Sequence, residues 1–295
     1  VNKGKVVYEW KDKTLGKKDF GYTAIVKTKN WQQRVNKKIP FPIEDISGYE
    51  QYTLPTEKID SNNHKIIAKA QEIVEGENDL FKATFKLANW VSENVDYDLN
   101  ELTTDVAQPA SWVLENKQGV CDEMTSLFVA MARSQGIPAR FVSGISYTEH
   151  EDVLAVVGSN WASHGWAEIY FPEFGWVSFD ITFDEYGYVD VTHIKLREGL
   201  DPDEPATKYQ WIANNVKLET GNLDLDVDIQ KEGNVIPEEI MLEQELLSKE
   251  TDLESYNLVK GVLRNTADYY VATTLRVAVP EEIEVIGNNR RTLLL

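Results

Sequence analysis

Residues 119–142, GVCDEMTSLFVAMARSQGIPARFV, decide the fold class of this 295-residue chain. Cys121–Gln135 is predicted to form a helix, because Gly136 and then Pro138 supply the expected stop signals. Ala139–Tyr147 follows at once and is rich in β-branched and aromatic residues, which indicates a strand. A helix that runs directly into a strand indicates a mixed core of the α+β class.

Two more strands are predicted downstream, at Gly165–Phe171 and Trp176–Asp180, with a turn at residues 172–175 between them. Thr148–Ser163 is interpreted as a long connection, and loops of that length usually have a function. Upstream of the decisive stretch we expect three helices, from helical spacing and capping residues. They are Asn62–Glu75, a second helix that Asp79 can cap, and Ser111–Asn116.

The length fits two or three compact units. Residues 1–56 are predicted to be an extended or β-rich segment, and 57–204 the α+β core. Residues 205–295 are expected to form an Ig-like β-sandwich that is truncated at its C-terminal end, because strands recur at regular spacing. Those strands are Leu223–Ile229, Tyr256–Leu263 and Tyr269–Val279.

Charge and composition exclude several classes of protein. A formal charge of −19 argues against nucleic-acid binding, which needs a basic surface. The charge is uneven: residues 1–40 hold eleven Lys/Arg and three Asp/Glu, whereas residues 201–260 hold fifteen Asp/Glu and five Lys/Arg. These segments can be two solvated surfaces, or the basic segment can dock on an acidic part of the molecule or on an anionic cell-envelope polymer.

The two ends of the chain carry an expectation about its setting. The chain begins at Val1 and ends in the apolar run Thr292–Leu295. No window holds eighteen consecutive apolar residues, so no membrane-spanning segment is predicted. We therefore expect a piece of a longer, extracellular or cell-surface protein that can be membrane-anchored elsewhere.

Cys121 is the single cysteine, which rules out an internal disulfide and a thiolate-rich metal site. One interpretation is that Cys121 is a buried structural cysteine. The other interpretation is that Cys121 is catalytic. The start of a helix favours an anion, and thus a thiolate, and the N–H groups there can hold an oxyanion. His164 comes just before a predicted strand and Asp180 ends the next one. If these strands form a hairpin, the two side chains face each other, which gives nucleophile, base and orienting carboxylate.

Three motifs in order resemble the transglutaminase-like superfamily. They are Gly119-Val120-Cys121 with the helix and strand up to Val142, then His164–Tyr170, and then Gly175–Thr182. Asn94–Tyr97 also resembles the segment that leads into this core in prokaryotic members. The sequence departs from the family at Gly165, where Ala is usual, and at Ile181, where Pro is usual.

This resemblance implies an α+β core in which the nucleophile helix packs on an antiparallel sheet. It also implies a Cys121–His164–Asp180 triad that attacks a carboxamide or peptide carbonyl and forms a thioester. Hydrolysis by a cysteine peptidase or amidase is the first expectation, as in prokaryotic surface members, on a protein or peptide substrate. Cross-linking of glutamine to an amine, as by a transglutaminase, is the second. A catalytically silent adhesion module is the third. No cofactor is expected, and the acidic residues around Tyr186–Tyr188 match no EF-hand calcium loop.

Further site residues are expected, the first of them from the same resemblance and the others from their places in the sequence. Tyr97 is the first candidate for oxyanion binding, together with the backbone of Cys121, and Gln108 and Trp112 follow. Trp166 is a candidate wall of the cleft. Trp112 and Trp161 are candidate substrate-binding residues, and Glu149 and His150 of the long connection could touch substrate as well.

Overall fold

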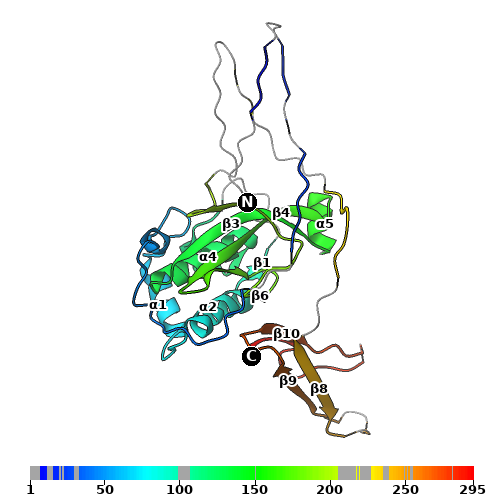
Figure 1. Ribbon diagram of the computed structural model, residues 1–295. Helices are drawn as coiled ribbons and strands as arrows, with labels where there is room; N and C mark the ends of the chain where they lie inside the picture. The colour runs from blue at the N-terminus through cyan, green and yellow to red at the C-terminus, as the bar shows by residue number, and fades with distance from the viewer. Residues whose placement is uncertain are drawn as a thin grey trace.

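A computed structural model shows a helical and sheet-forming core with separate strand pairs at the C-terminal end (Figure 1). It describes residues 7–11, 16–19, 21, 23–29, 33–98, 107–149, 151–204, 217, 219, 227–234, 239–248, 250, 252, 255–280 and 282–295, with the side chains of residues 152 and 156 excepted.

The helices follow the predicted order. They are the 3-10 helix η1 (Glu50–Thr53) and the α-helices α1 (His64–Ile73), α2 (Leu80–Asn94), α3 (Ala110–Asn116), α4 (Cys121–Ser134) and α5 (Glu151–Val157). Asp79 caps α2 as predicted, because its side chain accepts the Phe81 N–H at 3.0 Å. Gly136 follows α4 with a φ of 73°, a left-handed conformation that suits glycine and ends the helix.

A five-stranded sheet in the order β6-β5-β4-β3-β7 forms the other half of the core. Its strands are β3 (Ala139–Tyr147), β4 (Trp161–Phe171), β5 (Gly175–Asp180), β6 (Glu185–Tyr186) and β7 (Ile194–Gly199), and every neighbouring pair is antiparallel. A separate parallel pair joins β1 (Asp96–Tyr97) to β2 (Gln118–Gly119). The predicted α+β class with an antiparallel sheet is confirmed.

The segment before His164 differs from the prediction. Residues 151–157 form α5 and β4 begins at Trp161, so Thr148–Ser163 is not a structureless connection. The reason is that β3 pairs along its whole length with the first part of β4, from Ala139↔Ile169 to Tyr147↔Trp161. His164 therefore lies inside a strand, opposite Gly144, and not in front of one.

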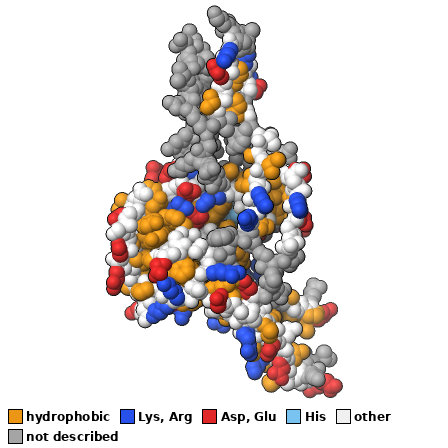
Figure 2. Space-filling model, viewed as in Figure 1, with side chains coloured by type: hydrophobic (Ala, Val, Ile, Leu, Met, Phe, Trp, Pro, Cys, Tyr) orange, Lys and Arg blue, Asp and Glu red, His pale blue; other side chains and the backbone are white. Residues whose placement is uncertain are grey.

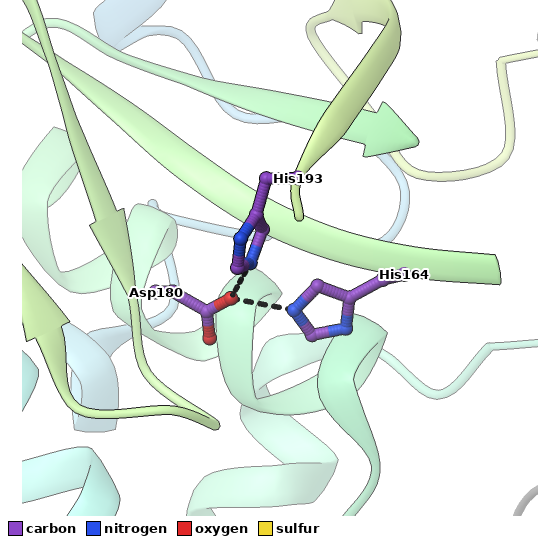
Figure 3. A group of neighbouring side chains, drawn as sticks. All are labelled: His164, Asp180 and His193. Carbon is purple, nitrogen blue, oxygen red and sulfur yellow. Dashed lines mark hydrogen bonds and ion pairs between the residues drawn. The ribbon is translucent and has the colours of Figure 1, made fainter. Parts of the chain in front are cut away.

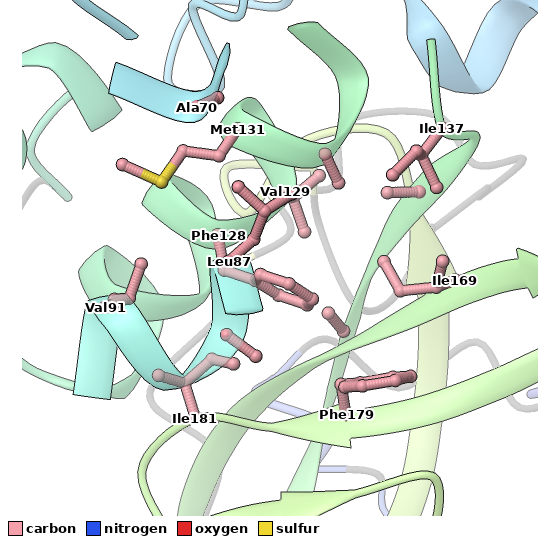
Figure 4. Packing of buried hydrophobic residues seen from close by; sticks show 14 of the residues in the cluster. Ala70, Leu87, Val91, Phe128, Val129, Met131, Ile137, Ile169, Phe179 and Ile181 are labelled. Atoms are coloured by element: carbon pink, nitrogen blue, oxygen red, sulfur yellow. The ribbon is translucent and has the colours of Figure 1, made fainter. Parts of the chain in front are cut away.

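The hydrophobic core lies between α4, the neighbouring helices and the sheet. Phe128 of α4 and Phe179 of β5 are fully buried, with ring centroids 5.8 Å apart. Figure 4 shows side chains of α2, α4 and the strands meeting here. Because apolar side chains anchor α4 to β4 and β5, the elements that carry Cys121, His164 and Asp180 are held together by the core.

The C-terminal region contains two antiparallel pairs. β8 (Ile240–Leu246) pairs with β9 (Val259–Asn265), and β10 (Ala272–Arg276) pairs with β11 (Arg290–Leu294). The strands predicted at 256–263 and 269–279 therefore belong to different pairs. Most of the strand predicted at 223–229 lies outside the described residues. The β-sandwich stays a prediction.

Contacts cross both predicted domain boundaries. Val35 and Ile39, from the N-terminal segment, are buried in the same hydrophobic cluster as the core helices, and so is Ala272 of β10. The division at residues 56 and 204 stays a prediction.

Charged side chains of both signs are interspersed over the visible face of the core (Figure 2). Docking of the basic N-terminal segment on an acidic surface or on an anionic polymer stays a prediction. Within the described residues, no helix combines the length and the apolar character that a membrane span requires.

Candidate active site

Cys121 is the first residue of α4, as predicted. The buried carboxylate of Glu123 shapes this helix start, because it accepts the Val120 N–H at 3.1 Å and the Gln108 N–H at 3.1 Å. Gly119 is required just before it, since a Cβ there would be 2.5 Å from the Glu123 Cβ. The N–H groups of the first turn have no partner within a helix and so remain available to an oxyanion.

The thiol of Cys121 is enclosed, with 7% of the residue exposed. Its Sγ lies 3.6 Å from Oδ1 of Asp122, and the backbone of Gly165 provides a hydrogen bond from β4. Burial raises the pKa of the thiol well above its ordinary value, and Asp122 adds to the effect, whereas the Gly165 hydrogen bond opposes it. The thiolate expected from the helix start is therefore not favoured: burial outweighs the helix start and keeps the sulfur a thiol, which needs a base in order to react.

His164 and Asp180 form the shortest contact of the site. The His164 Nε2 lies 2.5 Å from Asp180 Oδ2 (Figure 3). Oδ1 of Asp180 accepts the backbone N–H groups of Thr182 at 2.8 Å and Phe183 at 3.1 Å. Burial alone would raise the pKa of Asp180, but the charge and hydrogen bond of His164, and then those of His193, outweigh burial and lower it. Asp180 is therefore a fixed carboxylate.

The β4–β5 pairing gives this contact its geometry. Ala167 pairs with Phe179, so Asp180 at the end of β5 lies close to the position of His164 on β4, at the same end of the hairpin. The two residues are not directly opposite each other, because His164 is three residues before Ala167 while Asp180 is one residue after Phe179. The imidazole of His164 spans the distance between these two backbone positions and reaches the carboxylate of Asp180.

Gly165 links the helix that carries Cys121 to the strand that carries His164. Thr125 of α4 donates to the Gly165 carbonyl at 3.1 Å, which joins the first turns of α4 to β4 next to His164. A Cβ on Gly165 would meet the carboxylate of Asp122 and would lie 2.6 Å from Phe141 Cζ, so the alanine usual at this place would not fit. The three residues predicted to form the triad thus come from α4 (Cys121), β4 (His164) and β5 (Asp180).

Two residues of the site were not predicted. His193, just before β7, lies 2.9 Å from Asp180 Oδ2 through its Nε2. Asp122 lies beside the thiol, and burial and then Glu123 raise its pKa while His164 lowers it. The sequence contained little to single out His193 as a site residue, because it is one of four histidines. The order of strands in the sheet brings it to Asp180.

Two groups of described residues could hold a metal ion, since their ligand atoms lie within 4.8 Å of one another. The first is His164, Asp180 and His193, and the second is Glu185, Asp190 and His193. In the first group both histidines already lie at hydrogen-bond distance from Asp180, and in the second His193 does so from Asp190, whereas Glu185 Oε2 is 3.9 Å from His193 Nδ1. The expectation of no cofactor stays a prediction.

Tyr97 lies near the thiol through the β1–β2 pairing. It pairs with Gly119, two residues before Cys121, and 37% of it is exposed. Burial raises the pKa of its hydroxyl, and the proximity of Cys121 and then Asp122 raises it further. The hydroxyl therefore keeps its proton and can donate a hydrogen bond. Oxyanion binding by Tyr97 stays a prediction.

The three predicted tryptophans lie in different surroundings. Trp166 is 2% exposed and stacks behind His164, with ring centroids 6.1 Å apart. Trp161 is half-buried at the start of β4, edge-to-face with Tyr147. Trp112 packs against the hydrophobic core from α3. Substrate contact by these residues stays a prediction.

Gln108, Glu149 and His150 were also expected to lie at the site. Gln108 contacts the site through its backbone N–H, which Glu123 accepts. Glu149 accepts a long, 3.5 Å hydrogen bond from Tyr147, and His150 lies outside the described residues.

Comparison with known proteins identifies the core. Residues 67–181 match the family described as the transglutaminase-like superfamily. The uncharacterized protein YebA of Bacillus subtilis is 30% identical over 145 residues, which are 45% of this chain and 20% of YebA. An uncharacterized protein of Haemophilus influenzae is 25% identical over 264 residues, 79% of this chain and 67% of that protein. A crystal structure of a candidate cysteine protease from Cytophaga hutchinsonii is 20% identical, with a TM-score of 0.42 and coverage of 57% of this chain and 52% of that one.

Proposed function

Since residues 67–181 form a transglutaminase-like domain, we propose that this protein performs thiol-dependent acyl chemistry on a carboxamide or peptide bond. Cys121 is the nucleophile, His164 the general base and Asp180 the carboxylate that orients His164. The observation that carries the proposal is the 2.5 Å contact between His164 and Asp180, placed one residue from the Gly165 backbone that contacts the thiol.

The first step begins from a neutral thiol. The carboxylate of Asp180 accepts the Nε2–H of His164, so Nδ1 is the nitrogen that takes the proton of the thiol. As Sγ bonds to the carbonyl carbon, the carbonyl π bond opens and its electrons become an oxyanion. The donors that we propose for it are the N–H groups at the start of α4 and the hydroxyl of Tyr97.

Collapse of the tetrahedral intermediate breaks the C–N bond. The leaving amine takes the proton from His164, and a thioester remains on Cys121. Water then attacks the thioester while His164 accepts one of its protons. The C–S bond breaks, and the thiol regains the proton from His164. The products are a carboxylic acid and the free enzyme, as in a cysteine peptidase or amidase on a protein or peptide substrate.

The decisive test is the reactivity of Cys121 towards iodoacetamide across pH. We expect His164→Ala to slow alkylation by at least about 100-fold, the effect typical of a lost general base. His64→Ala is the matched control, since this exposed histidine lies at the start of α1. If His164→Ala and the wild type are alkylated at the same rate at every pH, the silent adhesion module replaces the enzyme.

A second measurement separates hydrolysis from amine transfer. A glutamine peptide is offered with and without a primary amine, and ammonia release and amine incorporation are both followed by mass spectrometry. We expect ammonia release to Glu product to dominate. Incorporation that outruns hydrolysis would make the protein a cross-linking enzyme. Cys121→Ser should abolish both reactions.

We also propose an extracellular or cell-surface location, supported by the resemblance of the core to prokaryotic surface hydrolases. Proteolysis of intact source cells tests it: the protein should be cut without lysis. Protection until the cells are lysed contradicts it.

A further inference from the structure

Asp180 binds a second histidine. His193 Nε2 lies 2.9 Å from the same Oδ2 atom that contacts His164 (Figure 3). With Thr182 and Phe183 donating to Oδ1, the carboxylate has four partners, two on each oxygen. A carboxylate accepts about four hydrogen bonds, so this set fills Asp180 and leaves it no freedom to rotate.

His193 is itself held from its other side. Its Nδ1 lies 2.9 Å from Asp190 Oδ1 and 3.9 Å from Glu185 Oε2. Thr192 fixes Asp190 in turn, by donating to the same Oδ1 through its backbone N–H at 2.8 Å and its hydroxyl at 2.6 Å. Because both ring nitrogens face carboxylates, both must carry protons, and His193 is a cation between two anions.

Aromatic packing fixes the plane of the His193 ring. Trp166 lies edge-to-face with it at 5.2 Å between centroids, and Phe183 does the same at 5.6 Å. The side chain is 1% exposed. The ring therefore has one orientation, and in that orientation Nε2 points at Asp180.

The sheet brings His193 to this place. β7 pairs with β3, with an irregular register at Ser143 and Gly144. A Cβ on Gly144 would lie 2.6 Å from Trp166 Cη2, so only glycine lets β3, β7 and Trp166 come together here. His193 directly precedes β7, and this position brings its Nε2 to the same Oδ2 atom of Asp180 that His164 contacts.

From these contacts we propose that His193 is a positioning residue, which holds Asp180 in the orientation that His164 requires. The inference rests on the proposed function, because it assigns a role in the same site. In this role His193 acts through its contact with Asp180. Without its N–H donor, one lone pair of a buried carboxylate is unsatisfied and Asp180 can rotate away from His164.

Two substitutions at His193 separate positioning from packing. His193→Leu fills the space but removes the donor, whereas His193→Gln retains an N–H that can reach Asp180. With the glutamine peptide as substrate, we expect His193→Leu to lower kcat by about 10- to 100-fold, the effect of losing one hydrogen bond to a charged group, with KM nearly unchanged. His193→Gln should recover most of the loss. Equal losses in both variants, or a folded His193→Leu protein with wild-type kcat, would overturn the proposal.

A measurement on the unaltered protein covers the case in which His193→Leu does not fold. In the NMR spectrum of the 15N-histidine-labelled protein, we expect one histidine with both ring nitrogens protonated and protected from exchange, assigned by its absence in His193→Gln. A His193 ring with one bare nitrogen contradicts the proposal.

Failure of the proposed function would look different. In that case His164→Ala does not change the rate at which iodoacetamide alkylates Cys121. Failure of this inference alone leaves alkylation that depends on His164 and a kcat that His193→Leu does not lower.

Discussion

The five-stranded sheet of the core and the β8–β9 pair are both antiparallel, yet they differ in what their side chains bury. In β4, six consecutive residues from His164 to Ile169 are buried, because α4 covers the sheet. In β8, six of seven residues are exposed. The comparison teaches that pairing alone does not fix side chains in space. The candidate active site lies where strands are also packed, and there a side chain has one position.

The largest difference is expected from removal of a core side chain. Phe128→Ala should lower the free energy of unfolding by about 3–5 kcal/mol, because a fully buried ring leaves a cavity. Leu242→Ala on β8, where the residue is 47% exposed, should change it by less than about 0.5 kcal/mol. Urea denaturation of both variants measures this. Similar losses would mean that β8–β9 is packed as tightly as the core.

The same glycine-to-alanine change should have unequal effects in the two regions. Gly165→Ala brings a Cβ against Asp122 and Phe141 and should cost about 1–3 kcal/mol of stability. It should also slow alkylation of Cys121, since Asp122 and His164 are displaced. Gly261→Ala on β9 has only Leu242 Cδ1 nearby, at 3.9 Å, and should be neutral. A neutral Gly165→Ala would show that the contact between α4 and β4 is looser than described.

The pH dependence of stability should come from the core. Burial lowers the pKa of His193, but its hydrogen bonds to Asp180 and Asp190 prevail and raise that pKa to about 10. The folded state then binds more protons than the unfolded state between pH 6.5 and 10, so this contribution is complete below pH 6.5 and is lost as pH rises towards 10.

Glu185 should also make the folded state less stable as pH rises, because burial and then Asp190 raise its pKa to about 8. Urea unfolding at pH 6, 8 and 9.5 should show stability that falls by at most about 1.4 kcal/mol per pH unit for each group. His193→Gln should flatten the slope above pH 8. An unchanged slope in that variant would mean that His193 is not charged in the folded protein.

The smallest effect concerns the contact between β11 and the core. Arg290 forms an ion pair with Asp184, a buried residue in the loop after Asp180 that also accepts from Ser92 and Tyr186. Because Arg290 is 42% exposed and Asp184 keeps its other partners, Arg290→Ala should cost about 1 kcal/mol. Hydrogen exchange should become faster in β10 and β11 but not in β4. Arg264→Ala, on exposed β9, is the control and should change neither.

Much of the core followed from local signals. The cap at Asp79, the start of α4 at Cys121 and the stop at Gly136 depend on residues a few positions apart, so spacing predicts them. His164 and Asp180 could be placed together because one turn joins their strands. The start of β4 was missed, since the partner that extends it is β3, and pairing with a whole strand leaves no signal in the residues 148–163.

The sequence by itself determined the α+β class, the helix start that carries the cysteine, and the order of cysteine, histidine and aspartate, because each depends on short-range spacing or on ordered motifs. Only the tertiary structure decided that His193 shares Asp180 with His164, and that Tyr97 lies beside the helix start. Both depend on strand pairing between distant segments, β7 with β3 and β1 with β2. Such pairing is selected by the packing of the whole core, and no local pattern records it.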